Sequence, residues 1–221
     1  MVMIRLIIFD LDGTLVDSSV DLTNALNYAI APYDMGQLSV EETKRLVGEG
    51  ITRLIEKLLG DERRGIRQAV MDRFMEHYSA HLVDFTRPYE AVPEVLGMLH
   101  RYRKAVISNK RESLSKRLLL HLGLLQFFDA VLGSDSVGEK KPSPKPVLRV
   151  MEMLSCNPDG AVIVGDSNYD LEAGRAAGIG TIAVSYGYRD VSLLQQADII
   201  IPRFQDLPSA LAHFGERGND A

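Results

Sequence analysis

Short apolar segments alternate with helix-like segments along much of this 221-residue chain. The apolar segments are residues 5–9, 104–107, 130–132, 161–164 and 181–184, with a weaker sixth at 198–201. Strands that alternate with helices are typical of βαβ units, which build a parallel sheet. Because these segments are apolar at nearly every position, helices are expected to cover both faces of each strand. The pattern therefore predicts an α/β fold with a parallel sheet and helices on both faces.

Residues 17–85 break this alternation. Three sets of apolar residues recur there at helical spacing, and no strand-like segment lies between them. Ser18 followed by Asp21 is typical of a helix start. We therefore predict an all-helical second domain at residues 17–85, inserted into an α/β domain made of residues 1–16 and 86–221. The hinges are expected near Val16 and at residues 85–88.

Composition and charge restrict the classes of partner. The formal net charge is −5 without a block of like charges, whereas a nucleic-acid binder normally carries a basic stripe. No apolar run approaches membrane-spanning length, and the N-terminus begins a strand rather than a signal peptide. The single cysteine, Cys156, excludes an intramolecular disulfide and fits a reducing compartment. We expect a cytoplasmic protein, monomeric or homodimeric, that acts on a small molecule and binds neither nucleic acid nor membrane.

Asp10 and Asp12 directly follow the first apolar segment, in the sequence Asp10-Leu11-Asp12-Gly13-Thr14. Side chains alternate along a strand, so the two carboxylates share a side if the extended geometry continues. Buried carboxylates are costly unless they are paired or bound to a metal, which favours a functional role. The alternative is a simple polar turn, since Asp and Gly are common turn residues.

Polar residues also adjoin later strand-like segments. They are Ser108 with Asn109, Lys141 before Pro142, and Asp166 with Asp170. In open α/β sheets the ligand binds beyond the carboxyl ends of the strands, so all of these residues can converge on one crevice. Each also has a structural explanation: a helix start at Ser108-Asn109, a solvated lysine at Lys141, and an N-cap at Asp166.

The order of these motifs resembles the four-motif signature of the haloacid dehalogenase superfamily. The resemblance covers the whole chain, and the helical insertion stands at the position of that superfamily's C1 cap. It implies a Rossmann-like α/β core and hydrolysis of a phosphate ester. Within the superfamily, residues 10–18, 47–50 and 88–92 are most similar to the phosphoglycolate phosphatase group. Ala91 departs from that pattern, because a glycine is usual at its position.

The resemblance implies distinct roles for the two aspartates of the first motif. Asp10 would attack phosphorus and form an aspartyl-phosphate. Asp12 would protonate the leaving group and then activate water. Mg²⁺ would be held by Asp10, the backbone carbonyl of Asp12 and Asp166, with Asp170 as a further ligand or as support for the site.

The resemblance also implies how the substrate is held. Ser108, the backbone N–H of Asn109 and Lys141 would bind the phosphoryl oxygens, together with Thr14 of the first motif. A loop of the helical insertion, Gly48-Glu49-Gly50, would contact the organic part of the substrate, although a simple turn between helices is an equal alternative. The favoured substrate is 2-phosphoglycolate.

Several alternatives stay open at this stage. A sugar phosphomutase would use the same aspartate pair, a pyrophosphatase is possible, and the chain could be a non-enzymatic module that binds a phosphorylated ligand. Arg53 could pair with a substrate carboxylate, and Lys110 and Arg111 could assist phosphate binding. His77 and His81 have a spacing that can bind zinc, but no third ligand is evident, and we expect them to flank a packed helix face.

Overall fold

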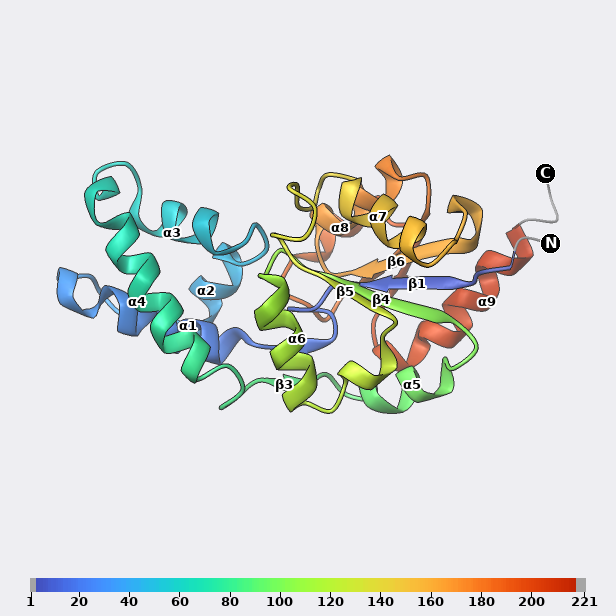
Figure 1. Cartoon of the computed structure of the whole chain (residues 1–221), viewed down its shortest axis with the longest axis horizontal. Helices are drawn as coiled ribbons and strands as arrows, with labels where there is room; N and C mark the ends of the chain where they lie inside the picture. Colours follow the sequence, from blue (N-terminus) through green and yellow to red (C-terminus); the bar gives the residue numbers. More distant parts are fainter. Residues whose placement is uncertain (1–2, 218–221) are drawn as a thin grey trace.

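A six-stranded parallel sheet forms the centre of the larger part of the molecule (Figure 1). The computed structural model describes residues 3–217. The strand order is β5-β4-β1-β6-β7-β8, so the first strand lies in the interior of the sheet. The strands are β1 (Leu6–Phe9), β4 (Arg103–Ile107), β5 (Ala130–Leu132), β6 (Ala161–Gly165), β7 (Gly180–Val184) and β8 (Ile199–Ile201). All six predicted segments are confirmed as strands, each to within one residue at either end.

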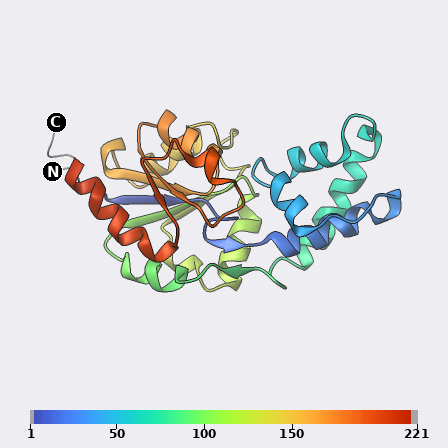
Figure 2. The same ribbon diagram turned by 180° about the vertical axis from the view of Figure 1, so that it is seen from behind.

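Helices cover both faces of this sheet, as predicted. Leu6 and Ile8 of β1 are buried in one apolar cluster, and Ile7 and Phe9 are buried in another on the opposite face. This alternation follows from the two-residue period of a strand. The first face is covered by α7 (Lys145–Met153) and α8 (Asn168–Ala176), and the second by α5 (Val92–Met98), α6 (Glu112–His121) and α9 (Leu207–Arg217) (Figures 1 and 2).

Four further helices lie together at one end of the molecule, opposite the end at which β1 begins and α9 ends, and are called here the helical part (Figure 1). They are α1 (Ser19–Ile30), α2 (Val40–Leu46), α3 (Ile51–Leu59) and α4 (Arg67–Ala80). The predicted periodicity accounts for α1, α3 and α4 but not for α2. Only Thr43 of α2 is buried, so this helix has no apolar repeat to detect. Its start is set instead by a capping box between Ser39 and Glu42.

Two chain crossings join the helical part to the sheet. The predicted hinge regions form a short antiparallel ribbon of β2 (Val16–Asp17) and β3 (Arg87–Pro88), which the sequence did not predict. The expected helix start is confirmed, because α1 begins at Ser19, but Ser18 makes no capping hydrogen bond. Asp21 instead accepts hydrogen bonds from Thr86 N–H (2.8 Å) and Thr86 Oγ1 (2.6 Å). These hydrogen bonds between Asp21 and Thr86 connect the two chain segments that join the helical part to the sheet.

No helix within residues 3–217 combines the length and the apolar character needed to cross a bilayer.

Candidate active site

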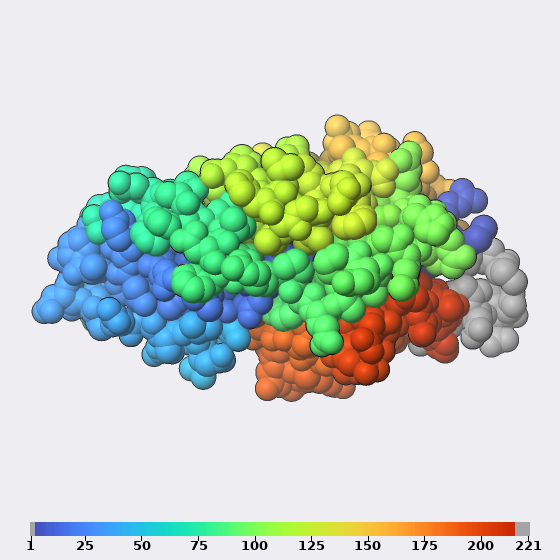
Figure 3. Space-filling view, turned by 90° about the horizontal axis from the view of Figure 1, so that it is seen from below, coloured from blue at the N-terminus to red at the C-terminus, as the bar shows by residue number. Residues whose placement is uncertain are grey.

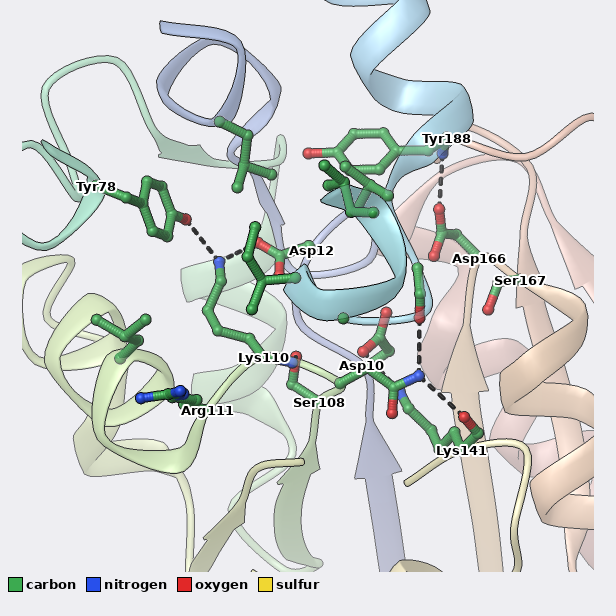
Figure 4. Close-up of a pocket in the computed structure, with 18 of the residues that line it drawn as sticks. Asp10, Asp12, Tyr78, Ser108, Lys110, Arg111, Lys141, Asp166, Ser167 and Tyr188 are labelled. Atoms are coloured by element: carbon green, nitrogen blue, oxygen red, sulfur yellow. Dashed lines mark hydrogen bonds and ion pairs between the residues drawn. The ribbon is translucent and has the colours of Figure 1, made fainter. Parts of the chain in front are cut away.

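The polar residues that follow β1, β4 and β6 surround one cavity of about 70 Å³ (Figure 4). These three strands are neighbours in the sheet, and their carboxyl ends meet at the same edge. The loops after these strands contribute Asp10, Asp12, Ser108, Asn109, Lys110 and Asp166 to the lining, and the loop after β5 contributes Lys141. The helical part contributes mainly apolar side chains: Leu22, Val47, Ile51, Leu54, Phe74, Met75 and Tyr78.

Lys141 is the centre of a buried network at the bottom of this cavity. Its ammonium group donates to Asp10 Oδ1 (2.6 Å), Asp170 Oδ1 (2.6 Å) and the Ile107 carbonyl (2.7 Å). A lysine has three N–H donors, so these contacts use all of them. Burial lowers the pKa of Lys141, but the charges of Asp10 and Asp170 outweigh it and raise the pKa above its usual value. Lys141 is therefore a permanent positive charge beside Asp10.

Asp10, Asp166 and Asp170 form a buried acidic cluster, with one oxygen of each within 4.8 Å of the others. Burial raises the pKa of Asp10 to about 7, an effect that Lys141 opposes and Asp170 strengthens. Burial and the charge of Asp10 likewise raise the pKa of Asp166. Among the described residues, no lysine or arginine pairs with Asp166; it accepts one hydrogen bond, from the Tyr188 N–H (2.7 Å). Lys141 is the one cation in contact with these three carboxylates among the described residues, so the cluster keeps an excess of negative charge, and its hard oxygen donors suit Mg²⁺.

The side chain of Asp166 packs directly against the backbone of two glycines, Gly13 and Gly187. A Cβ at Gly13 or Gly187 would overlap the Asp166 side chain. Gly13 also has a φ of +88°, which favours glycine. Asp166 is thus held between two glycine loops, one after β1 and one after β7.

Asp12 lies beside a second buried lysine. Asp12 Oδ1 accepts hydrogen bonds from Ser18 Oγ (2.5 Å) and Lys110 Nζ (2.6 Å), and Lys110 Nζ also contacts Tyr78 Oη (2.8 Å) (Figure 4). Burial raises the pKa of Tyr78 to about 12, so its hydroxyl stays protonated. Lys110 therefore joins the carboxylate of Asp12 to a tyrosine of α4 in the helical part.

Several hydrogen-bond donors near Asp10 are uncommitted. The Ser108 hydroxyl accepts from the Lys110 N–H (3.1 Å), and no acceptor for its own proton lies within residues 3–217. The Asn109 N–H likewise donates no hydrogen bond to the described residues. The Asn109 side chain instead donates to the carbonyls of Gly48 (2.7 Å) and Lys141 (3.0 Å). The free donors at this point suit an anion with several oxygens.

The helical part is closed against this site. Arg189 donates to the carbonyls of Arg45 (3.0 Å) and Val47, and Lys140 donates to the Glu49 carbonyl. A Cβ at Gly50 would lie 2.8 Å from the Asn109 carbonyl oxygen, so the loop approaches the strand end closely. Figure 3 shows α6 resting against α4, where Arg117 donates to the Ser79 carbonyl (2.9 Å).

Some predicted residues do not reach the cavity. Thr14 is fully buried outside it, with no partner for its hydroxyl oxygen in the described part of the chain. Gly48 and Gly50 line the cavity, but Glu49 turns its carboxylate to Lys57 and Arg53. Arg53 also pairs with Glu56 (3.0 Å), so it is directed away from the cavity. Asp170 does not line the cavity, because it accepts from Lys141 and from Ser167 Oγ (2.6 Å).

The sequence also missed residues that shape the site. Tyr78, Tyr188 and Arg189 were not predicted to belong to the site, and Ser18 was predicted only as a helix start. Tyr188 and Arg189 follow β7 in the sequence Tyr186-Gly187-Tyr188-Arg189. Polar residues after a further parallel strand were a usable signal, because that strand also ends at the site. The rings of His77 and His81 are in tilted contact (4.4 Å between ring centroids), with His77 half-buried and His81 exposed beside Asp84 (2.8 Å).

Comparison with known proteins agrees with this geometry. The family model described as haloacid dehalogenase-like hydrolase matches residues 7–184. A phosphoglycolate phosphatase of Aquifex aeolicus is 39% identical over 205 residues, covering 92% of this chain and 94% of the relative. A phosphoglycolate phosphatase of Neisseria meningitidis is 38% identical over 206 residues, covering 90% and 88%.

Solved structures show the same arrangement. A crystal structure of a predicted phosphoglycolate phosphatase from Haemophilus somnus has a TM-score of 0.88 and 28% identity, and the match covers 94% of this chain and 97% of that one. The similarity thus extends over the sheet and the helical part together.

Proposed function

The chain belongs to the haloacid dehalogenase-like hydrolases, and we propose that it hydrolyses 2-phosphoglycolate with Mg²⁺ through a phosphorylated Asp10. Its relatives establish the coarser activity, that of a phosphoric monoester hydrolase. The observation that carries the finer proposal is the position of Asp10. It lies between a buried lysine and an acidic cluster, with the uncommitted Ser108 and Asn109 donors lining the same cavity.

The first half of the reaction transfers the phosphoryl group to the protein. A carboxylate oxygen of Asp10 attacks phosphorus, and the bond between phosphorus and the ester oxygen breaks. Asp12 gives its proton to that departing oxygen. The Ser108 hydroxyl and the Asn109 N–H bind the phosphoryl oxygens, and the positive charge of Lys141 beside Asp10 stabilises the charge of the transition state.

The second half releases phosphate. Asp12, now ionised, takes a proton from a water molecule as the water oxygen attacks phosphorus. The acyl phosphate bond breaks, and Asp10 is restored as a carboxylate. Closure of the helical part, which we propose acts as a cap, keeps other water away from the intermediate.

Mg²⁺ would be held by Asp10, Asp166 and the Asp12 carbonyl, which accepts no hydrogen bond within the described residues. It would supply the positive charge that lets a carboxylate approach a phosphate dianion. Asp170 has both oxygens occupied by Lys141 and Ser167, so we assign it to positioning Lys141.

The size of the cavity supports a small substrate. A cavity needs at least about 10–15 Å³ of volume open to a water-sized sphere to hold one water molecule. The cavity of about 70 Å³ therefore holds on the order of five or six waters. The phosphoryl group takes part of this space, so a nucleoside or sugar leaving group exceeds what remains while the helical part is closed. The two-carbon leaving group of 2-phosphoglycolate needs less space in the cavity than either of these.

A panel of phosphate esters tests this function. Phosphate release is measured with Mg²⁺ for 2-phosphoglycolate, glucose 1-phosphate, a nucleoside monophosphate and pyrophosphate, with Asp10→Asn as the control protein. We expect the highest kcat/KM for 2-phosphoglycolate and no turnover by the variant. Isomerisation of glucose 1-phosphate without phosphate release would indicate a mutase. Binding without any turnover by the folded wild-type protein would indicate a binding module.

A further inference from the structure

We propose that Lys110 binds the carboxylate of the leaving group and so selects phosphate esters whose carboxylate lies close to the ester oxygen. This inference rests on the proposed function and deepens it. It assigns substrate preference to a residue of the sheet domain, next to the acid Asp12, rather than to the predicted loop around Glu49.

The hydrogen bonds of Lys110 leave one donor available. Its ammonium group contacts Asp12 Oδ1 (2.6 Å) and Tyr78 Oη (2.8 Å), and no third acceptor lies within residues 3–217. The side chain is only 7% exposed, so bulk water does not readily take that place. Lys141 differs, because protein acceptors use all three of its donors. Lys110 is thus a buried cation with a free N–H in the cavity.

The surroundings of Lys110 make it the cation best placed to meet a second anionic group. The helical part lines the cavity with apolar residues, among them Leu54 and Met75, and Phe74 packs on Tyr78, the hydrogen-bond partner of Lys110 (5.2 Å between the ring centroids). Arg189 is committed to carbonyls of the helical part, and Arg111 is exposed at the edge of the cavity. A buried carboxylate is costly without a cation, so a ligand carboxylate enclosed here is stable only near Lys110.

The position of Lys110 relative to Asp12 limits how far the carboxylate of the leaving group can lie from the ester oxygen. Asp12 must reach the ester oxygen to protonate it, and Lys110 contacts the same carboxylate group of Asp12. Two consecutive hydrogen bonds place the lysine nitrogen about 5–6 Å from the ester oxygen. A carboxylate one carbon away from that oxygen, as in 2-phosphoglycolate, lies within this reach. A carboxylate on a longer chain would extend past the lysine into the apolar wall.

A competing explanation is that Lys110 only orients Asp12. The two explanations differ in what happens to substrate preference. A residue that only orients the acid affects all esters equally, whereas a residue that binds the carboxylate affects only esters that carry one.

The test compares 2-phosphoglycolate with ethyl phosphate, which has a methyl group in place of the carboxylate. The ratio of their kcat/KM values is measured for the wild-type protein, for Lys110→Met and for the control Lys140→Met. Lys140 contacts the Glu49 carbonyl and does not line the cavity, so its loss removes a nearby charge without touching the leaving group. We expect the ratio to fall at least about tenfold in Lys110→Met, the loss of one charged hydrogen bond, and to persist in Lys140→Met.

The remaining outcomes are equally informative. An equal loss for both esters in Lys110→Met would overturn the inference and leave Lys110 as a positioning residue. A wild-type protein that hydrolyses both esters without preference would instead refute 2-phosphoglycolate as the substrate, whatever the variant does. If Lys110→Met is unfolded by circular dichroism, Lys110→Gln replaces it, since its amide still donates to Asp12 but carries no charge.

Discussion

At the residue scale, backbone groups place Asp166 more firmly than side chains do. The Tyr188 N–H donates to its carboxylate, and Gly13 and Gly187 pack against it from two loops. The packing is tight enough that a single methyl group has no space. The position of this carboxylate therefore depends on two glycines that carry no chemistry of their own.

Gly187→Ala is expected to displace Asp166 and weaken Mg²⁺ binding. The added Cβ would overlap the Asp166 side chain and lie 2.6 Å from the Gly13 carbonyl oxygen, and neither neighbour is a flexible chain end. The measurement is the rise in melting temperature on adding Mg²⁺, because a ligand that binds the folded state stabilises it. The rise should be much smaller in the variant.

Gly36→Ala is the matched control, because a Cβ there meets nothing within 4 Å. It should keep the full Mg²⁺-dependent rise. Equal responses of both variants would show that the crowding around Asp166 does not govern the metal site.

The site residues that directly follow a strand could be predicted from the sequence. Asp10, Ser108 and Asp166 lie where the rule for open α/β sheets puts them. Tyr188 and Arg189 act through a backbone N–H and through contacts to backbone carbonyls, so only their place after β7, and not their side-chain spacing, could have indicated them. Thr14 was assigned from its motif alone, and its side chain packs away from the cavity.

At the element scale, Arg189 caps a helix of the helical part. The last carbonyls of a helix have no partner within it and carry partial negative charge. Arg189 donates to the Arg45 and Val47 carbonyls at the end of α2, and lies 3.4 Å from the Lys44 carbonyl. A residue after β7 thus stabilises the closed position of a helix more than a hundred residues away in sequence.

Arg189→Ala is expected to favour an open arrangement of the helical part. Hydrogen bonds to a charged group contribute about 1.5–3 kcal/mol, so the closed form loses about a factor of ten or more in population. Small-angle scattering should show a larger radius of gyration, with a matching fall in kcat/KM. Arg175→Ala serves as the control, since Arg175 is exposed and donates to Gln196 rather than to the helical part. Unchanged scattering and activity in Arg189→Ala would contradict this role.

The ribbon between the two parts contains a carboxylate with a defined pH response. Burial alone raises the pKa of Asp17, but hydrogen bonds from Ser19 and Tyr188 outweigh it, so the pKa is lowered overall. A lowered pKa means that the ionised form stabilises the folded protein above the unfolded value of about 3.9, and that this contribution is lost as the pH falls further.

Asp17→Asn should therefore lower the free energy of unfolding at pH 7, and the difference from the wild type should shrink as the pH falls from about 4 towards 3. Urea unfolding at several pH values measures this. Asp159→Asn, which changes an exposed aspartate, should show no such difference. A difference for Asp17→Asn that grows with acid would contradict the assigned hydrogen bonds.

At the scale of the whole molecule, the sheet was predictable and the placement of the helical part was not. Apolar segments such as residues 161–164 specify strands buried on both faces, and β6 is found there. A capping box stabilises the start of α2, and backbone hydrogen bonds pair β2 with β3. Neither feature produces a periodic pattern of apolar residues, so neither element could be predicted from such a pattern. The closed arrangement depends on a few contacts between distant residues, such as Asn109 with Gly48, that no local pattern encodes.

The central claim is that Asp10 carries the phosphoryl group between substrate and water. Trapping that group tests it most directly: the protein is mixed with Mg²⁺ and 2-phosphoglycolate radiolabelled in its phosphate, and quenched with acid during the first turnover. We predict label on the peptide that contains Asp10 in the wild-type protein, and neither label nor turnover in Asp10→Asn. Phosphate release with no protein-bound label at any time, or turnover by Asp10→Asn, would contradict the account.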